Sequence, residues 1–498
     1  MKGFTSRTVR LAVIANERVK RGIIVHRTSR IMRGLTAIAG LAAAAPAFAV
    51  DDEARFRDLY RELVETNTTL SEGSCTAASE KMQARLIAAG VPRADTEVVV
   101  SPDFPKQGNL IARLPGSDAK APAILLVAHI DVVEAKRSDW KRDPFKLVEE
   151  NGYFYARGAI DDKAMASAFV DALVRYREEG FKPRRTIKLA LTCGEETDSV
   201  FNGVQYLLKT RPDALKAGFA VNEGGKGFLD AAGKPVLFGV QAGEKIYQDY
   251  KLVATSPGGH SSRPGKDNAI TRLSNVLGRI GAFAFPVAPG EVARNFFAQS
   301  AALYEGQQRA DMQAIGAGTA DAAAYARISD ASPVWNATLR TTCVSTMVNA
   351  GHAPNALAQH AQANVNCRIL PGQSVEDIRR VLAQAGADPS VEIALDGEPG
   401  PVSPAPPLTR EIMAPVEAIV KDIWPGVPVI PSISTGATDG RFLLAAGIPT
   451  YGISAVFVDP DGNGVHGLDE RVRVKSLLDA RAFLYRLVKS YANGKGGR

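Results

Sequence analysis

The sequence is poor in the features that mark a membrane protein, a nucleic-acid-binding protein or a cysteine-rich zinc site. Its 498 residues include only 4 cysteines and 7% aromatic residues. No apolar run reaches the ~20 residues that a membrane-spanning helix needs. The remaining composition, 45% hydrophobic and 23% charged residues, is that of an ordinary globular protein. The length predicts two or more domains.

The formal net charge of +7 is concentrated in the first 49 residues. Nine of the 60 lysines and arginines lie there, but only one of the 53 acidic residues, which leaves 51 basic and 52 acidic residues in the remainder. A nucleic-acid-binding surface needs an excess of positive charge, so we expect no nucleic-acid partner.

Residues 1–49 have the pattern of a secretory leader. Arg30 and Arg33 precede a short apolar stretch that ends in Ala47-Phe48-Ala49, an A-x-A cleavage motif. A membrane anchor is the alternative, but the stretch is too short for one. We therefore expect a protein exported to the periplasm or secreted, cleaved near Ala49, with no membrane span in the mature chain. The long segment before Met32 suggests that translation starts at Met32.

The four cysteines do not have the spacing of zinc ligands. An exported chain permits disulfides, and four cysteines allow three complete pairings. We favour the simpler interpretation that they are small buried residues, and Cys343–Cys367 is the pair to test first. The cysteines are Cys75, Cys193, Cys343 and Cys367.

From about residue 52 onward the hydrophobic pattern predicts an α/β fold. Helical spacing of apolar residues covers about 52–90, and strand-like runs follow, ending in an all-apolar run at 123–133. A helix is expected over 163–180 and another buried strand over 184–196. Strand, helix and strand in this order imply crossover connections, and therefore a mostly parallel sheet flanked by helices.

The pattern changes near Gly243. Residues 245–256 alternate between apolar and polar, as an antiparallel strand with one wet face does. An Ala-rich helical stretch is expected over about 290–328, and a strand over 335–347. A Pro- and Gly-rich segment then marks a boundary. We predict an inserted α+β lid or dimerisation domain, with this division of the chain: leader 1–49, catalytic domain 50–242, lid domain 243–398, and catalytic domain 399–498.

Five separated segments place a histidine or carboxylate beside an apolar run or a glycine. His129 and Asp131 end a buried strand, and their spacing puts both side chains on one face, where Asp131 could orient a ligating His129. Each segment alone also fits a core histidine, a helix cap or a solvated surface pair. In combination they favour a metal-dependent hydrolase. The other segments contribute Asp161, Glu195 with Glu196, Glu223, and His466.

These motifs resemble the dizinc metallopeptidase family of carboxypeptidase G, aminoacylase and succinyl-diaminopimelate desuccinylase. The His-x-Asp, Gly-x-x-Asp-Asp-Lys, Glu-Glu and distant His motifs occur in family order, across nearly all of the chain after the leader. The resemblance implies two Zn²⁺ ions, with Co²⁺ or Mn²⁺ as substitutes. It also implies that Asp161 bridges the ions and that the Asp161–Asp162 peptide is cis. The implied metal ligands are His129, Asp161, Glu196, Glu223 and His466.

The same resemblance implies the catalytic roles. Asp131 would orient His129, and Glu195 would be the general base that takes a proton from the attacking water and returns it to the leaving amine. His260 would supply a donor for the tetrahedral oxyanion, in many relatives from the neighbouring subunit of a homodimer formed through the lid domain. The alternative for His260 is a histidine on a surface loop.

Substrate recognition would fall to the lid and to a Gly-rich loop. Arg368 and Asn355 match positions that hold a substrate carboxylate, for which a planar guanidinium is suited. Gly436 would donate a backbone N–H. The chain departs from the family at His352, where a lysine is expected, and in an Ala-rich insertion at about 285–335, which could block the dimer surface.

The residues and the resemblance predict a zinc-dependent exopeptidase of the carboxypeptidase or dipeptidase kind. Its substrate would be a peptide whose amine product carries a free α-carboxylate. N-acyl amino acids, cleaved at the same site by an aminoacylase activity, are the alternative, and esters or lactams stay open. A non-catalytic homologue acting as a binding domain should lack a ligand or the base, whereas here every expected position is filled.

Overall fold

The computed structural model describes residues 47–197 and 200–494. The leader and the start at Met32 lie outside these residues. The expected cleavage position, Ala49, falls in the first turn of helix α1 (Ala47–Val64), and its cleavage stays a prediction. None of the helices in the described part of the chain is long and apolar enough to cross a bilayer.

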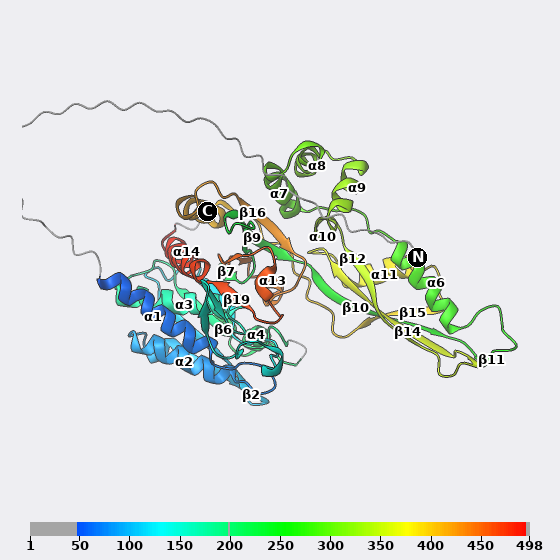
Figure 1. Cartoon of the computed structure of the whole chain (residues 1–498), viewed down its shortest axis with the longest axis horizontal. Coiled ribbons are helices and arrows are strands. Elements are labelled where there is room, and N and C mark those ends of the chain that lie inside the picture. The colour runs from blue at the N-terminus through cyan, green and yellow to red at the C-terminus, as the bar shows by residue number, and fades with distance from the viewer. Residues whose placement is uncertain (1–46, 198–199, 495–498) are drawn as a thin grey trace, which may run out of the picture. The chain divides into compact units, whose positions relative to one another are not determined.

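A 10-stranded mixed sheet carries the larger α/β part of the fold (Figure 1). At its centre β6, β3, β7 and β17 are parallel neighbours, whereas β1–β2 and β2–β6 are antiparallel at one edge. All residues of β3 are buried, as expected for a strand covered on both faces. The prediction of a mostly parallel sheet flanked by helices is confirmed. In spatial order the strands are β1 (Thr96–Ser101), β2 (Phe104–Leu114), β6 (Ile187–Thr192), β3 (Ile124–His129), β7 (Phe219–Asn222), β17 (Thr450–Gly452), β9 (Pro235–Glu244), β8 (Gly227–Leu229) and β18 (Phe457–Val458), with β16 (Val429–Ser434) beside β9.

Helices cover this sheet with their apolar faces. Helix α3 packs on β3 and on α14, which also contacts α12, and α2 packs on β2. Their buried side chains, including Phe169, Val420 and Phe483, belong to one hydrophobic core with the inner strands. The helices are α2 (Cys75–Ala88), α3 (Lys163–Glu178), α4 (Gly203–Thr210), α5 (Pro212–Leu215), α12 (Arg410–Ile423), α13 (Gly440–Ala445) and α14 (Val474–Asn493).

A separate 4-stranded antiparallel sheet, in the order β12-β14-β10-β15, lies between β9 and α12 in the chain. Its strand β10 alternates buried with more exposed residues, as expected for 245–256. Helices α6 and α11 supply a second hydrophobic core. These elements fall within the predicted lid domain, whose boundaries stay a prediction. They are β10 (Ile246–Thr255), β11 (Gly259–His260), β12 (Thr342–Ala350), β13 (Ala356–Leu357), β14 (His360–Ile369), β15 (Val391–Asp396), α6 (Ala269–Ala282) and α11 (Val375–Gly386).

The Ala-rich stretch is helical, as expected, but it continues further than predicted. Helices α7 (Glu291–Ser300), α8 (Gly306–Ala317), α9 (Ala322–Ala331) and α10 (Pro333–Leu339) share a small core of their own. The strand prediction for 335–347 is therefore wrong in its first part. Ser332 caps α10 by accepting from the Trp335 N–H, and Pro333 stands at the first helical position, where its fixed φ favours a helix.

The prediction that the four cysteines are small buried residues without disulfides is also wrong. Disulfides join Cys75 to Cys193 and Cys343 to Cys367. The second pair is the one singled out for testing, and its residues lie directly opposite each other on β12 and β14. Cys75 and Cys193 are 118 residues apart in the sequence, so only the packing of α2 beside the end of β6 brings them together.

Candidate metal centre

Neighbouring parallel strands deliver most of the candidate ligands to one place. His129 is the last residue of β3, Glu195 and Glu196 follow β6, and Glu223 follows β7. Because these strands run parallel, their carboxyl ends meet at the same edge of the sheet, where open α/β sheets place their sites. Asp161 approaches from the segment before α3.

Asp161 lies between the two histidines. Its Oδ1 is 3.2 Å from His129 Nε2, and its Oδ2 is 3.3 Å from His466 Nε2. Glu196 Oε1 is 2.9 Å from His466 Nε2, and Glu223 Oε1 is 3.9 Å from His129 Nε2. The Asp161–Asp162 peptide bond is cis, as the resemblance implies. Side chains separated by more than 330 positions in the sequence therefore converge.

The convergent atoms form overlapping groups that suit metal ions. His129, Asp161 and Glu223 make one group, and Asp161, Glu196 and His466 make another, each with its ligand atoms within 4.8 Å of one another. A third group combines His129 with the adjacent Glu195 and Glu196. Imidazole nitrogens with carboxylate oxygens are the donors that Zn²⁺ accepts in catalytic sites. The donor set therefore fits a pair of divalent ions that share Asp161.

The electrostatics of the group agree with this fit. Burial raises the pKa of Glu223 to about 7, with the charge of Asp161 adding to the effect. Burial, and then the Glu223 charge, raises the pKa of Glu195 well above its ordinary value. Although burial opposes it, hydrogen bonds from both histidines hold the pKa of Asp161 below its usual range. The cluster is thus an excess of crowded carboxylates, which divalent cations would neutralise.

Asp131 makes more contacts than the orientation of His129, its expected role, requires. Its carboxylate accepts the backbone N–H groups of Glu195 and Glu196 at 3.3 and 3.0 Å. His129 Nδ1 lies closer to the main-chain oxygen of Asp131, at 3.1 Å, than to the carboxylate, at 3.6 Å. Asp131 therefore ties the Glu195–Glu196 segment to the end of β3 and touches His129 through two oxygen atoms.

The residues predicted to bind substrate lie on other elements. His260 is exposed on β11, where its Nδ1 bonds the N–H and the hydroxyl of Ser262. Asn355 lies close by, because its main-chain oxygen accepts the Ser261 N–H at 3.0 Å. The Ser261–Asn355 bond continues the small ladder between β11 and β13, whereas the contacts between His260 and Ser262 are local. The contacts of the described residues thus bring His260 and Asn355 together, but place neither among the candidate ligands.

Arg368 and Gly436 already have partners within the chain. The Arg368 guanidinium lies 4.6 Å from the centre of the Tyr247 ring, and burial lowers its pKa. The Gly436 N–H, expected to face substrate, donates to Ser434 Oγ at 3.1 Å. Gly436 can serve a substrate only if this local turn opens.

Two buried acids hold the Gly-rich loop against the site, and sequence patterns did not single out Glu244. Asp439 accepts from Thr192 Oγ1 at 2.9 Å and from Asn202 Nδ2 at 2.6 Å, which fastens the loop to the end of β6. Glu244, the last residue of β9, accepts the Thr438 N–H at 2.6 Å. A lone glutamate at the end of a strand has no local signal of burial, and only the fold reveals it.

We expect Glu244→Gln to remove a loss of folding stability that the native chain shows as the pH rises from about 5 to about 8. Burial raises the pKa of Glu244 to about 8, so the folded chain keeps a proton that the unfolded chain releases near pH 4.5. The stabilisation linked to this proton is present at pH 4 and falls as the pH rises towards 8. Denaturant unfolding at pH 5, 7 and 9 should show the variant gaining roughly 3–5 kcal/mol over the native chain between pH 5 and 9. Parallel pH profiles would contradict the expectation.

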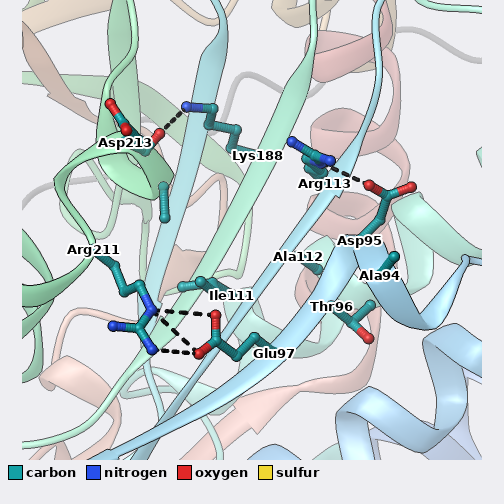
Figure 2. A pocket seen from close by; sticks show the side chains of 11 residues that line it. Ala94, Asp95, Thr96, Glu97, Ile111, Ala112, Arg113, Lys188, Arg211 and Asp213 are labelled. Carbon is teal, nitrogen blue, oxygen red and sulfur yellow. Dashed lines mark hydrogen bonds and ion pairs between the residues drawn. The ribbon is translucent and has the colours of Figure 1, made fainter.

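A hollow of about 300 Å³ lies away from the candidate ligands (Figure 2). It forms beside β1, β2 and the first residues of β6, whereas the candidate ligands follow the last residues of β6. Its cations are already bonded: Arg113 to Asp95 at 2.6 Å and Arg211 to Glu97 at 2.7 Å. The hollow is therefore a poorer candidate for catalysis than the acidic cluster.

Comparison with known proteins agrees with the geometry. The family described as peptidase family M20/M25/M40 matches residues 125–490. The N-fatty-acyl-amino acid synthase/hydrolase PM20D1 of Mus musculus is 29% identical over 404 residues, covering 75% of each chain. Aminoacylase-1 of Mus musculus is 27% identical over 350 residues, covering 68% of this chain and 73% of its own.

The fold also has solved counterparts. The metallo-carboxypeptidase Sso-CP2 of Sulfolobus solfataricus aligns with a TM-score of 0.64 at 19% identity, covering 88% of this chain and 99% of its own. At this identity the likeness concerns the fold. The match to the family covers most of the chain, including the segments of all the candidate ligands. This chain therefore belongs to peptidase family M20/M25/M40 and is a metal-dependent hydrolase.

Proposed function

We propose that this protein is an exported, zinc-dependent hydrolase that cuts an amide bond next to a free carboxylate. The observation that carries the proposal is the convergence of His129, Asp161, Glu196, Glu223 and His466 into groups that share Asp161. Cleavage of a C-terminal residue or of a dipeptide is the first form of this activity. The leader pattern of residues 1–49 supports export.

His129 and Glu223 would hold one ion, Glu196 and His466 the other, and Asp161 both. Bound divalent ions would polarise the scissile carbonyl and make water a better nucleophile at neutral pH. Zn²⁺ is the proposed ion because the donors combine imidazole and carboxylate, and Co²⁺ or Mn²⁺ would be accepted by the same set. Asp131 would keep His129 and the Glu195–Glu196 segment in place.

Glu195 is the proposed general base. It lies beside the proposed ligand Glu196, and its backbone N–H donates to the carboxylate of Asp131. Its raised pKa, caused by burial and by Glu223, suits a group that takes a proton from water and then donates it to the leaving amine. A carboxylate whose charged form is disfavoured by burial readily passes on the proton that it has taken, which one hydrolytic cycle requires.

Arg368, Asn355, Gly436 and His260 are proposed to bind the substrate. Arg368 is the strongest of them, because a half-buried guanidinium stacked on Tyr247 offers a fixed fork for a carboxylate. His260 would donate to the oxyanion, and it would reach the site by movement of the predicted lid domain or from the second copy of a homodimer. We keep the homodimer as a proposal.

The second candidate is hydrolysis of N-acyl amino acids by the same residues. It is favoured by two relatives, whose names describe an aminoacylase and a synthase or hydrolase of N-fatty-acyl-amino acids. Both candidates need the same base and the same carboxylate recognition. They differ in what occupies the acyl side of the cut bond.

A substrate panel separates these activities. Zinc-reconstituted protein should be given dipeptides, short peptides, N-acetyl and N-long-chain-acyl amino acids, each with a matched C-terminal amide. We expect hydrolysis of free acids and a large loss of kcat/KM for the amides, because Arg368 then lacks its partner. Zinc-loaded protein that binds these compounds and hydrolyses none would support a binding domain and end the proposal.

A further inference from the structure

The carboxylate of Glu470 is buried, and both of its oxygens accept hydrogen bonds. Glu470 lies four residues after the candidate ligand His466. Only 1% of its side chain is exposed. Its Oε2 accepts from Arg157 Nη1 at 2.7 Å and from the Gly158 N–H at 3.0 Å. Its Oε1 accepts the N–H groups of Ile160 and Asp161 at 3.0 and 3.2 Å. One side chain of the His466 loop thus binds the backbone that leads into Asp161.

Arg157 completes the connection in the opposite direction. Its Nη2 donates to the main-chain oxygen of Gly467, the residue next to His466, at 2.8 Å. The guanidinium is itself 3% exposed and lies 5.0 Å from the centre of the Trp140 ring. A buried, charge-assisted hydrogen bond between a guanidinium and a carboxylate that also accepts backbone N–H groups is a strong and directional contact.

A short sheet joins the same two segments at their bases. Strand β19 (Arg471–Arg473), which follows Glu470, pairs with β5 (Tyr153–Tyr155), which in turn pairs with β4 (Val148–Glu150). The Ala156 N–H donates to the Glu470 main-chain oxygen at 3.1 Å. The pairing holds the segments that contain β5 and β19 side by side. Glu470 extends this contact towards the candidate metal centre.

His466 needs such support more than the other candidate ligands. Its side chain is 54% exposed, whereas that of His129 is 1% exposed. Its φ is +58°, a left-handed conformation that residues other than glycine adopt only where the surroundings enforce it. Packing therefore does little to hold its imidazole, so the loop backbone must set its position.

We propose that Glu470 is a positioning residue that sets the separation of Asp161 and His466, and so the affinity of the metal site that these two share with Glu196. The inference rests on the metal centre proposed above. Glu470 touches neither ion nor substrate in this proposal. It acts by binding both loops at once, as outer partners of metal ligands do.

Glu470→Gln tests the proposal with little change of shape. The amide nitrogen of glutamine is a donor, so it would face either the Ile160 and Asp161 N–H groups or the Arg157 and Gly158 donors. We expect zinc titration of chelator-treated protein against a competing dye to show two sites in the native chain. In the variant one site should be roughly 10–100-fold weaker and the other nearly unchanged. Asp461→Asn is the matched control, because Asp461 pairs with Arg471 on the same loop but at the surface.

A merely structural role would appear differently. It would lower the melting temperature of the zinc-free variant and leave the zinc affinity of the folded fraction equal to that of the native chain, and this result would overturn the proposal. If Glu470→Gln does not fold, hydrogen exchange of the native zinc-free chain decides. Slow exchange of the Gly158, Ile160 and Asp161 amides supports a preformed contact, and fast exchange rejects it. A native chain that binds no zinc would instead reject the proposed function.

Discussion

Replacing Glu195 by glutamine is expected to lower kcat by roughly 10²–10⁴-fold while the protein keeps both zinc ions. Glutamine has the shape of glutamate but cannot accept the proton of the attacking water. The rate should be measured on the best substrate of the panel, and the zinc content by elemental analysis of the same samples. KM should change little, because Glu195 is not expected to contact the substrate carboxylate.

Measuring the zinc content of Glu195→Gln distinguishes a general base from a metal ligand. Glu195 belongs to one of the groups whose atoms lie within 4.8 Å, together with His129 and Glu196, so a ligand role is the alternative. Loss of one zinc ion in Glu195→Gln would assign it as a ligand and refute the base. Glu134→Gln is a suitable control, since Glu134 bonds Ser71 at the surface and should leave rate and zinc unchanged.

Replacing Asp161 by alanine is expected to abolish the binding of both ions and with it all turnover. Asp161 is the residue shared by the group of His129, Asp161 and Glu223 and the group of Asp161, Glu196 and His466. The loss should exceed the roughly 10–100-fold weakening that follows removal of an outer partner, because two direct ligand atoms disappear. Zinc titration of the variant should therefore show no site with native affinity.

Single-site variants provide the comparison for Asp161. Glu223→Gln and Glu196→Gln should each weaken one zinc site and spare the other, since each glutamate belongs to one of the groups that share Asp161. If Asp161→Ala loses only one ion, Asp161 does not bridge. Chelator treatment of the native protein should reproduce the inactive state, and added Zn²⁺ or Co²⁺ should restore turnover.

Local sequence patterns located the elements that are long and periodic. The helix expected over 163–180 is α3, the run at 123–133 contains β3, and the alternation at 245–256 is β10. Each of these patterns records which face of an element is buried, and burial repeats along the element itself. The short strands β4, β5 and β19 have three residues each, too few to show a period.

The segment 335–347 shows where local reasoning failed. Its apolar and β-branched residues favoured a strand throughout, but the first part is the helix α10, capped by Ser332. The same limit applies to Lys245, which is 1% exposed and donates to the main-chain oxygens of Ala337 and Arg340 at 2.9 and 2.8 Å. A lysine that anchors the end of a distant helix looks like a surface residue in sequence.

The order of the motifs by itself determined the family and the candidate ligands, because ligand chemistry limits which residue types can occur at those positions. The hydrophobic pattern by itself determined the α/β class, because burial repeats along each element. Tertiary structure alone decided the two disulfides, the hold of Asp131 on the Glu195–Glu196 segment, and the burial of Glu244 and Glu470. These features depend on contacts between segments that the chain separates by tens to hundreds of residues. No local pattern records such contacts, since a carboxylate has the same sequence signal whether it lies in water or accepts four buried hydrogen bonds.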